Sequence, residues 1–337
     1  MVIIATLTDA VPALSRADPG EIDHGEMTET ASAVPDAPVV PDAPETGGYA
    51  SFTARLQHQS GPLEFSREAG RKAHIAPPQP SSPDMASPDR ASPDRASPAW
   101  LRYAAVMPAT MGRPVIAIIL DDLGLDRPRS ERAVMLSAPV TLSYLPYARH
   151  LAEQTEGARL RGHELMVHLP MEPIDGRENP GPHALLKALP EGELVKRLEW
   201  ALSRFTGYVG VNNHMGSRLT RDSRAMAVVM GRLKAHGLLF VDSRTSIRSV
   251  AIIAARDAQV PNAERNIFLD HVDRLDAIQD QLEIVEQVAR RQGFAIAIGH
   301  PRDATLAALE SWMATARARG FVFVPVSAIV RGIYSLG

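Results

Sequence analysis

Two adjacent carboxylates raise the first chemical question. The segment VIAIILDDLG, residues 115–124, is a run of apolar residues that ends in Asp121 and Asp122. Such a run is typical of a buried strand, and neighbouring carboxylates at its end repel each other and lose hydration on burial. A cap for a following helix needs only one aspartate. The pair therefore indicates a functional site better than it indicates a cap.

Further potential ligands and catalysts end most of the other apolar runs. His214 lies in a polar turn beside two asparagines and a glycine, and His300 ends a run just before a proline, so both suit a site. His168 could instead be a hydrogen-bonded core residue, and Asp242 could equally be a helix cap. The weaker candidates are Glu172, Asn213, Arg244, Asp270 and His271.

The elements that must position these residues alternate between strands and helices. From Pro114 onward, short apolar runs, among them VIAIIL, ELMVHL, YVGVNN, NIFLD and FAIAIG, are separated by segments of helical period. Helices are expected after Pro190, over residues 222–237 and 276–293, and from an N-cap at Asp303 to Gly320. This alternation predicts an α/β fold with a mainly parallel sheet, either doubly wound or closed. Seven or eight strands in roughly 225 residues favour a (β/α) barrel.

The predicted fold gathers the scattered polar residues. In parallel α/β folds the carboxyl ends of the strands open onto one face, where active sites lie. Because the candidate residues follow the strands, we expect them to converge there.

Composition limits the chemistry of this site. The chain has 337 residues, no cysteine, a formal net charge of -3 and a pI near 6.4. A nucleic-acid partner is not expected, because there is no basic excess. Thiolate zinc sites and cysteine nucleophiles are excluded, so a metal would be held by His, Asp or Glu.

The first 112 residues have a different character. They are rich in Pro, Ser, Ala and Asp and contain the near-repeat SSPDMASPDRASPDRASPAW. This composition predicts a disordered tether or passive spacer over 1–112, followed by a folded domain over 113–337. The opening apolar stretch is short and broken by Asp9 and Pro12, which predicts neither an export signal nor a transmembrane helix.

Five motifs in order carry a family resemblance: IAIILDDLG, HLPMEP, NNHMGSRLT, FVDSRTS and IGHPRDAT. Over about residues 113–335 the chain resembles the divergent polysaccharide deacetylases, relatives of the NodB-type carbohydrate esterases. The resemblance implies a distorted (β/α) barrel of about seven parallel strands. It also implies a metal-dependent hydrolase that removes N-acetyl groups from a carbohydrate, such as peptidoglycan or another acetylated glycan, in the bacterial periplasm or cell envelope.

The resemblance also implies roles for individual residues. It makes Asp121 the catalytic base, Asp122 and His168 metal ligands, and His300 the general acid. Glu172 stands where the family's HxxxH motif has its second histidine, so His214 is the candidate for the missing ligand. Two imidazoles and one carboxylate favour zinc among divalent metals. The remaining candidates would surround the metal or substrate: Glu172, Asn213, Asp242, Arg244 and Asp270.

Two other readings stay open. One is hydrolysis of a different bond, such as an O-acetyl ester, at the same site. The other is a catalytically weak or inactive barrel that binds an envelope glycan or a protein partner.

Overall fold

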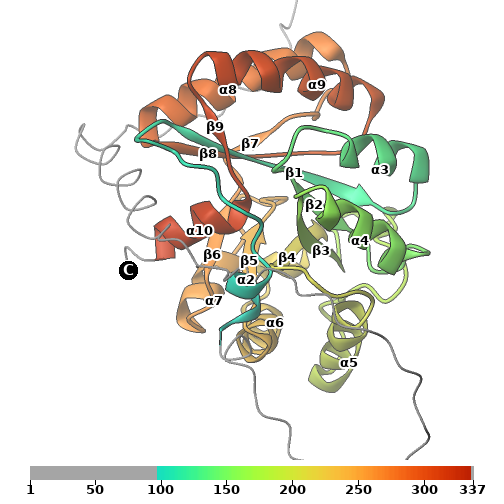
Figure 1. Ribbon diagram of the computed structural model, residues 1–337. Helices are drawn as coiled ribbons and strands as arrows, with labels where there is room; N and C mark the ends of the chain where they lie inside the picture. The colour runs from blue at the N-terminus through green and yellow to red at the C-terminus, as the bar shows by residue number, and fades with distance from the viewer. Residues whose placement is uncertain (1–96, 335–337) are drawn as a thin grey trace, which may run out of the picture. The chain divides into compact units, whose positions relative to one another are not determined.

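The apolar runs of the sequence form strands that pair in parallel. In the computed structural model, which describes residues 97–334, the sheet runs in the order β6-β5-β4-β3-β2-β1-β8-β7, and β9 pairs with β1 outside this path (Figure 1). Within these residues β6 and β7 do not pair, so the sheet is a curled, open barrel. The expected distorted (β/α) barrel is therefore confirmed. The strands are β1 Val115–Leu123, β2 Thr141–Tyr144, β3 Glu164–Met171, β4 Gly210–Met215, β5 Leu239–Asp242, β6 Asn262–Glu264, β7 Ile267–Phe268, β8 Phe294–Gly299 and β9 Val322–Phe323.

Helices connect the strands and lie around the sheet, with α8 and α9 side by side near β8 (Figure 1). No helix of residues 97–334 has both the length and the apolar character required to cross a bilayer. The helices are α2 Ala99–Arg102, α3 Arg127–Val134, α4 Leu151–Leu160, α5 Glu191–Leu202, α6 Ser223–His236, α7 Ala251–Asp257, α8 Leu275–Gln292, α9 Asp303–Ala318 and α10 Val326–Tyr334, with a short 3-10 helix, η2, at Leu219–Arg221.

Both faces of the sheet are apolar. Along β1, Ile116 and Ile118 belong to the larger core, which includes helices α3 to α9, whereas Ala117 and Ile119 belong to a second cluster with α10. Side chains alternate between the two faces of a strand, so a strand buried on both faces reads as a continuous apolar run. This double burial explains why VIAIIL contains no polar residue.

A buried carboxylate fastens α10 to the amino end of β3. Glu164 accepts hydrogen bonds from the backbone N–H and the hydroxyl of Ser327, from the Thr141 hydroxyl and from the Ala105 N–H. Burial raises the pKa of Glu164, although these donors lower it. Segments far apart in the sequence thereby meet at the amino end of β3.

The predicted helix ends are partly correct. Asp222 caps α6 through the Ala225 N–H, and Gly237 ends it with φ 63°, as expected. The prediction that Asp303 is an N-cap is wrong, because Asp303 is the first residue of α9 and Arg302 holds the cap position. The Asp303 carboxylate instead pairs with two arginines of α3.

The described fold begins before Arg113. Trp100 of α2 is 6% exposed, belongs to the α10 cluster and meets Tyr334 edge to face. The prediction of a disordered tether covers residues 1–112, of which 1–96 lie outside the described residues.

Candidate metal centre and catalytic site

An irregularity in β1 positions the paired aspartates. The register with β2 shifts between Leu120 and Leu123, and Asp122 has φ 59°. Neighbouring residues of a regular strand point to opposite faces, whereas a bulge can redirect a side chain. Both carboxylates thereby approach one imidazole: Nε2 of His168 lies 3.7 Å from Asp121 Oδ2 and 3.2 Å from Asp122 Oδ1.

Asp122, His168 and His214 form a compact cluster of possible ligands. Nδ1 of His214 lies 2.8 Å from Asp122 Oδ1, and one ligand atom from each residue lies within 4.8 Å of the other two. His168 faces Asn212 across the β3–β4 pair, and His214 is two residues further along β4, on the same face as Asn212. The sheet therefore brings together the three residues expected to hold a metal.

The carboxylates and imidazoles of this site shift each other's pKa values. Burial raises the pKa of Asp122, but the nearby His168 and His214 outweigh it and hold the pKa well below its usual range. Burial lowers the pKa of His168, whereas Asp121 and Asp122 raise it, with a net value of about 8. The cluster thus pairs the Asp122 carboxylate with a His168 imidazole whose pKa is raised.

These donors fit a divalent metal. The Asp122 side chain is 36% exposed as a whole, yet its Oδ1 is buried and accepts no hydrogen bond of regular geometry, despite the two close nitrogens. Two imidazoles and a carboxylate lie close together here, and Asp122 Oδ1 has no hydrogen-bond partner of regular geometry. Such a group is a suitable ligand set for zinc or a similar ion. Three protein ligands also leave positions for water and substrate, as in catalytic sites.

Asn212 links this cluster to Asp121. Its Oδ1 lies 2.9 Å from Nδ1 of His168 and accepts a 2.6 Å hydrogen bond from Ser143. Its Nδ2 donates to Asp121 Oδ1 at 2.7 Å and to the Ser243 hydroxyl at 3.2 Å. Asn212 is not among the residues predicted from the sequence, which include its neighbour Asn213 instead. Asn212 lies two residues before His214, and residues at this spacing in a strand lie on the same face, so the spacing could have identified Asn212.

Asp121 itself is a buried acid. Burial raises its pKa, and His168, His300 and the Asn212 hydrogen bond lower it; the net effect is a raised pKa. A carboxyl group whose pKa is shifted toward neutrality is better suited to accept and return protons than an ordinary surface aspartate.

His300 approaches the cluster from the other side. Its Nδ1 lies 3.0 Å from Asp270 Oδ1, and its Nε2 lies 3.8 Å from Asp122 Oδ2. Asp270 Oδ2 also accepts hydrogen bonds from the His300 N–H and from Thr305. Burial lowers the pKa of His300, but Asp270 outweighs it, and the net pKa is raised. Asp270 therefore favours a protonated His300.

The other predicted residues have structural partners. Glu172 accepts a hydrogen bond from the Lys187 N–H and pairs with Arg218. Asp242 accepts hydrogen bonds from the Arg244 N–H and from Ser249. Neither carboxylate belongs to the ligand cluster.

Two further candidates also lie outside the ligand cluster. Asn213 accepts a hydrogen bond from the Ser243 N–H and donates to the Met215 carbonyl. The guanidinium of Arg244 pairs with Glu264. Both side chains hold the loops that follow β4 and β5.

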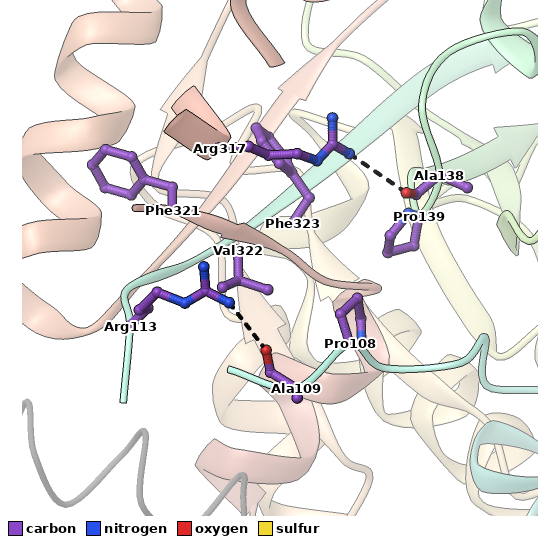
Figure 2. A pocket seen from close by; sticks show the side chains of 9 residues that line it. All are labelled: Pro108, Ala109, Arg113, Ala138, Pro139, Arg317, Phe321, Val322 and Phe323. Atoms are coloured by element: carbon purple, nitrogen blue, oxygen red, sulfur yellow. Dashed lines mark hydrogen bonds between the residues drawn. The ribbon is translucent and has the colours of Figure 1, made fainter. Parts of the chain in front are cut away.

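A separate hollow lies near the amino ends of β1 and β9. Figure 2 shows it between two arginines, Arg113 and Arg317, each of which donates to a backbone carbonyl at its rim. No histidine or carboxylate is among the nine residues that line it. It therefore offers no set of metal ligands of the kind found at the carboxyl ends of the strands.

The curled parallel barrel carries its Asp-His-His cluster on β1, β3 and β4, and comparison with known proteins identifies the family of this α/β protein. Residues 118–330 match the family described as "Divergent polysaccharide deacetylase". The chain belongs to this family, which confirms the resemblance.

Similar proteins extend over most of the same region. The chain is 32% identical over 198 residues to an uncharacterized protein of Haemophilus influenzae, covering 58% of this chain and 70% of that protein. It is 33% identical over 215 residues to the uncharacterized protein YibQ of Escherichia coli, covering 62% and 66%. Among solved structures, the uncharacterized protein ATU2773 of Agrobacterium tumefaciens is 31% identical, with a TM-score of 0.67, covering 69% of this chain and 95% of that one.

Proposed function

We propose that the chain is a metal-dependent hydrolase that removes N-acetyl groups from a carbohydrate. The observation that carries the proposal is the convergence of Asp122, His168 and His214, with Asp121 and His300 next to them. Family membership supports a carbohydrate substrate. A peptidoglycan substrate and a location in the bacterial periplasm or envelope belong to the same proposal.

Asp122, His168 and His214 would hold the ion, for which zinc is the preferred candidate. A bound divalent ion supplies Lewis acidity toward the acyl oxygen and toward water. The reaction consumes one water: its oxygen bonds to the acyl carbon, the C–N bond breaks, and the products are acetate and an amine.

The side chains on the two sides of the cluster would move the protons. Asp121, held by Asn212, would accept a proton from the attacking water. His300, oriented and charged by Asp270, would donate a proton to the leaving nitrogen. The raised pKa of His300 supports this assignment, because a group that gives up a proton must hold one at working pH.

The experiment has two stages. The metal content of the purified full chain is measured first, and one divalent ion per chain is expected. Acetate release is then measured with acetylated chito-oligosaccharides, peptidoglycan fragments and O-acetylated glycans, in the presence of zinc, manganese or cobalt. Acetate release only from the O-acetylated glycans would show that the protein cleaves an ester bond and not the proposed amide bond. Bound metal without acetate release from any of these would favour a binding barrel, and a metal-free inactive chain would contradict the proposal.

A further inference from the structure

We infer that Asn212 is a positioning residue that fixes which nitrogen His168 offers to the metal and holds Asp121 in place for proton transfer. The inference rests on the proposed function in one respect, namely that His168 is a ligand. Nothing in the family match assigns a role to Asn212.

Every hydrogen-bonding position of the Asn212 amide is used. Asn212 is fully buried, its oxygen is close to His168 and Ser143, and its nitrogen is close to Asp121 and Ser243. An amide oxygen can accept two hydrogen bonds and an amide nitrogen can donate two. A buried polar side chain with all partners in place is held in one orientation.

The direction of each hydrogen bond sets the tautomer of His168. A carboxylate only accepts, so the amide nitrogen faces Asp121 and the amide oxygen must face His168. The oxygen can only accept, so Nδ1 of His168 must carry a hydrogen. In a neutral imidazole the free electron pair then lies on Nε2, the atom 3.2 Å from Asp122 Oδ1. A partner on the far ring nitrogen commonly orients metal-binding histidines in this way.

The position of Asn212 in the sheet places it between His168 and Asp121. Asn212 lies opposite His168 in the β3–β4 register, and Ser143 and Ser243 approach it from β2 and from the end of β5. The same amide also reaches Asp121 on β1. The Asn212 side chain thus connects the proposed ligand His168 to the proposed base Asp121.

Three variants of the full chain separate these roles. Asn212→Leu removes all four hydrogen bonds and keeps the number of side-chain heavy atoms. Asn212→Asp keeps an acceptor for His168 but replaces the amide donor with a second carboxyl group against Asp121, so that these two carboxyl groups must share a proton. Ser243→Ala is the matched control, because it removes one buried hydrogen bond to the same nitrogen and touches neither His168 nor Asp121. Metal affinity is measured by competition with a chelator. The tautomer of His168 is measured by ¹⁵N NMR of metal-free, histidine-labelled protein at about pH 9.5, where imidazoles are neutral, with His168→Gln identifying the signals.

We expect wild-type His168 to carry its hydrogen on Nδ1. Asn212→Leu should weaken metal binding about 10- to 100-fold and populate both tautomers. Asn212→Asp should keep the Nδ1–H tautomer and near-normal metal affinity, and Ser243→Ala should match the wild type in both measurements. Wild-type His168 with its hydrogen on Nε2 would overturn the inference even if Asn212→Leu fails to fold. Unchanged metal affinity and tautomer in a folded Asn212→Leu would also overturn it. A wild type that binds no metal would contradict the proposed function instead, while the tautomer would still test the role of Asn212.

Discussion

The imidazole rings of His168 and His214 meet edge to face, with centroids 5.0 Å apart, although they come from different strands. Each ring presents a nitrogen to Asp122 Oδ1. The second imidazole of the cluster is thus supplied by β4, while Glu172, which follows β3, binds Lys187 and Arg218. His214 is therefore the residue on which the proposed metal centre is best tested.

His214→Ala should reduce metal content to well below one ion per chain, because the loss of one of three protein ligands removes most of the affinity of an open site. Elemental analysis after dialysis measures the effect. Glu172→Gln serves as the control and should keep the metal. Full occupancy in His214→Ala together with loss in Glu172→Gln would transfer the ligand role to Glu172.

Asp121→Asn and His300→Ala should keep the metal and the fold but reduce turnover by roughly 10²- to 10⁴-fold, the usual contribution of general acid or base catalysis. Acetate release across pH distinguishes their roles. Removing the base should abolish the acidic limb of a bell-shaped profile, and removing the acid should abolish the alkaline limb. Loss of metal in either variant would show that the residue is a ligand.

Asp270→Asn should shift the alkaline limb of the profile to lower pH. The Asp270 carboxylate raises the pKa of His300, so its removal lowers that pKa and the proton donor is lost at a lower pH. Asparagine keeps the shape and one acceptor atom, so metal content should be unchanged. An alkaline limb that stays in place would show that Asp270 does not influence the group that donates the proton.

His163 should make the fold less stable below about pH 6.5. Burial lowers its pKa, although the hydrogen bond with the Val134 carbonyl partly opposes the shift. The unfolded chain then binds a proton more readily than the folded chain, so this contribution is complete above the unfolded pKa and is lost as pH falls toward the folded pKa. Urea unfolding at several pH values should show a weaker pH dependence for His163→Gln than for the wild type. A change at exposed His271 is the control, and equal slopes for His163→Gln and the wild type would contradict this role.

Trp100→Ala should lower the free energy of unfolding by about 3 kcal/mol, the lower end of the usual cost for a buried tryptophan. The side chain packs in the α10 cluster and against Tyr334. Leu101→Ala is the matched control, since Leu101 is the next residue of α2 and is exposed, and it should change stability by less than about 0.5 kcal/mol. Equal effects of the two changes would show that α2 contributes little to the fold.

The sequence predicts which strands end in functional residues, because apolar runs and the polar residue after each are local features. It does not predict the bulge that brings Asp121 and Asp122 to one imidazole, since a register shift depends on the partner strand β2. The choice between Asn212 and Asn213 likewise depends on which residues of β4 face inward. Asp303 was misassigned because its pairing with α3 is a long-range contact that outweighs a local capping preference.

Strand β3 carries Glu164 at its amino end, followed by Met166 and then by His168 near its middle, all at two-residue spacing and therefore on one face. The carboxylate at one end of this row anchors the last helix, and the imidazole at the other end belongs to the proposed metal centre. A displacement of α10 would therefore be transmitted along a single extended segment, with no intervening loop to absorb it. α10 thus supports the amino end of the strand that carries the proposed ligand His168.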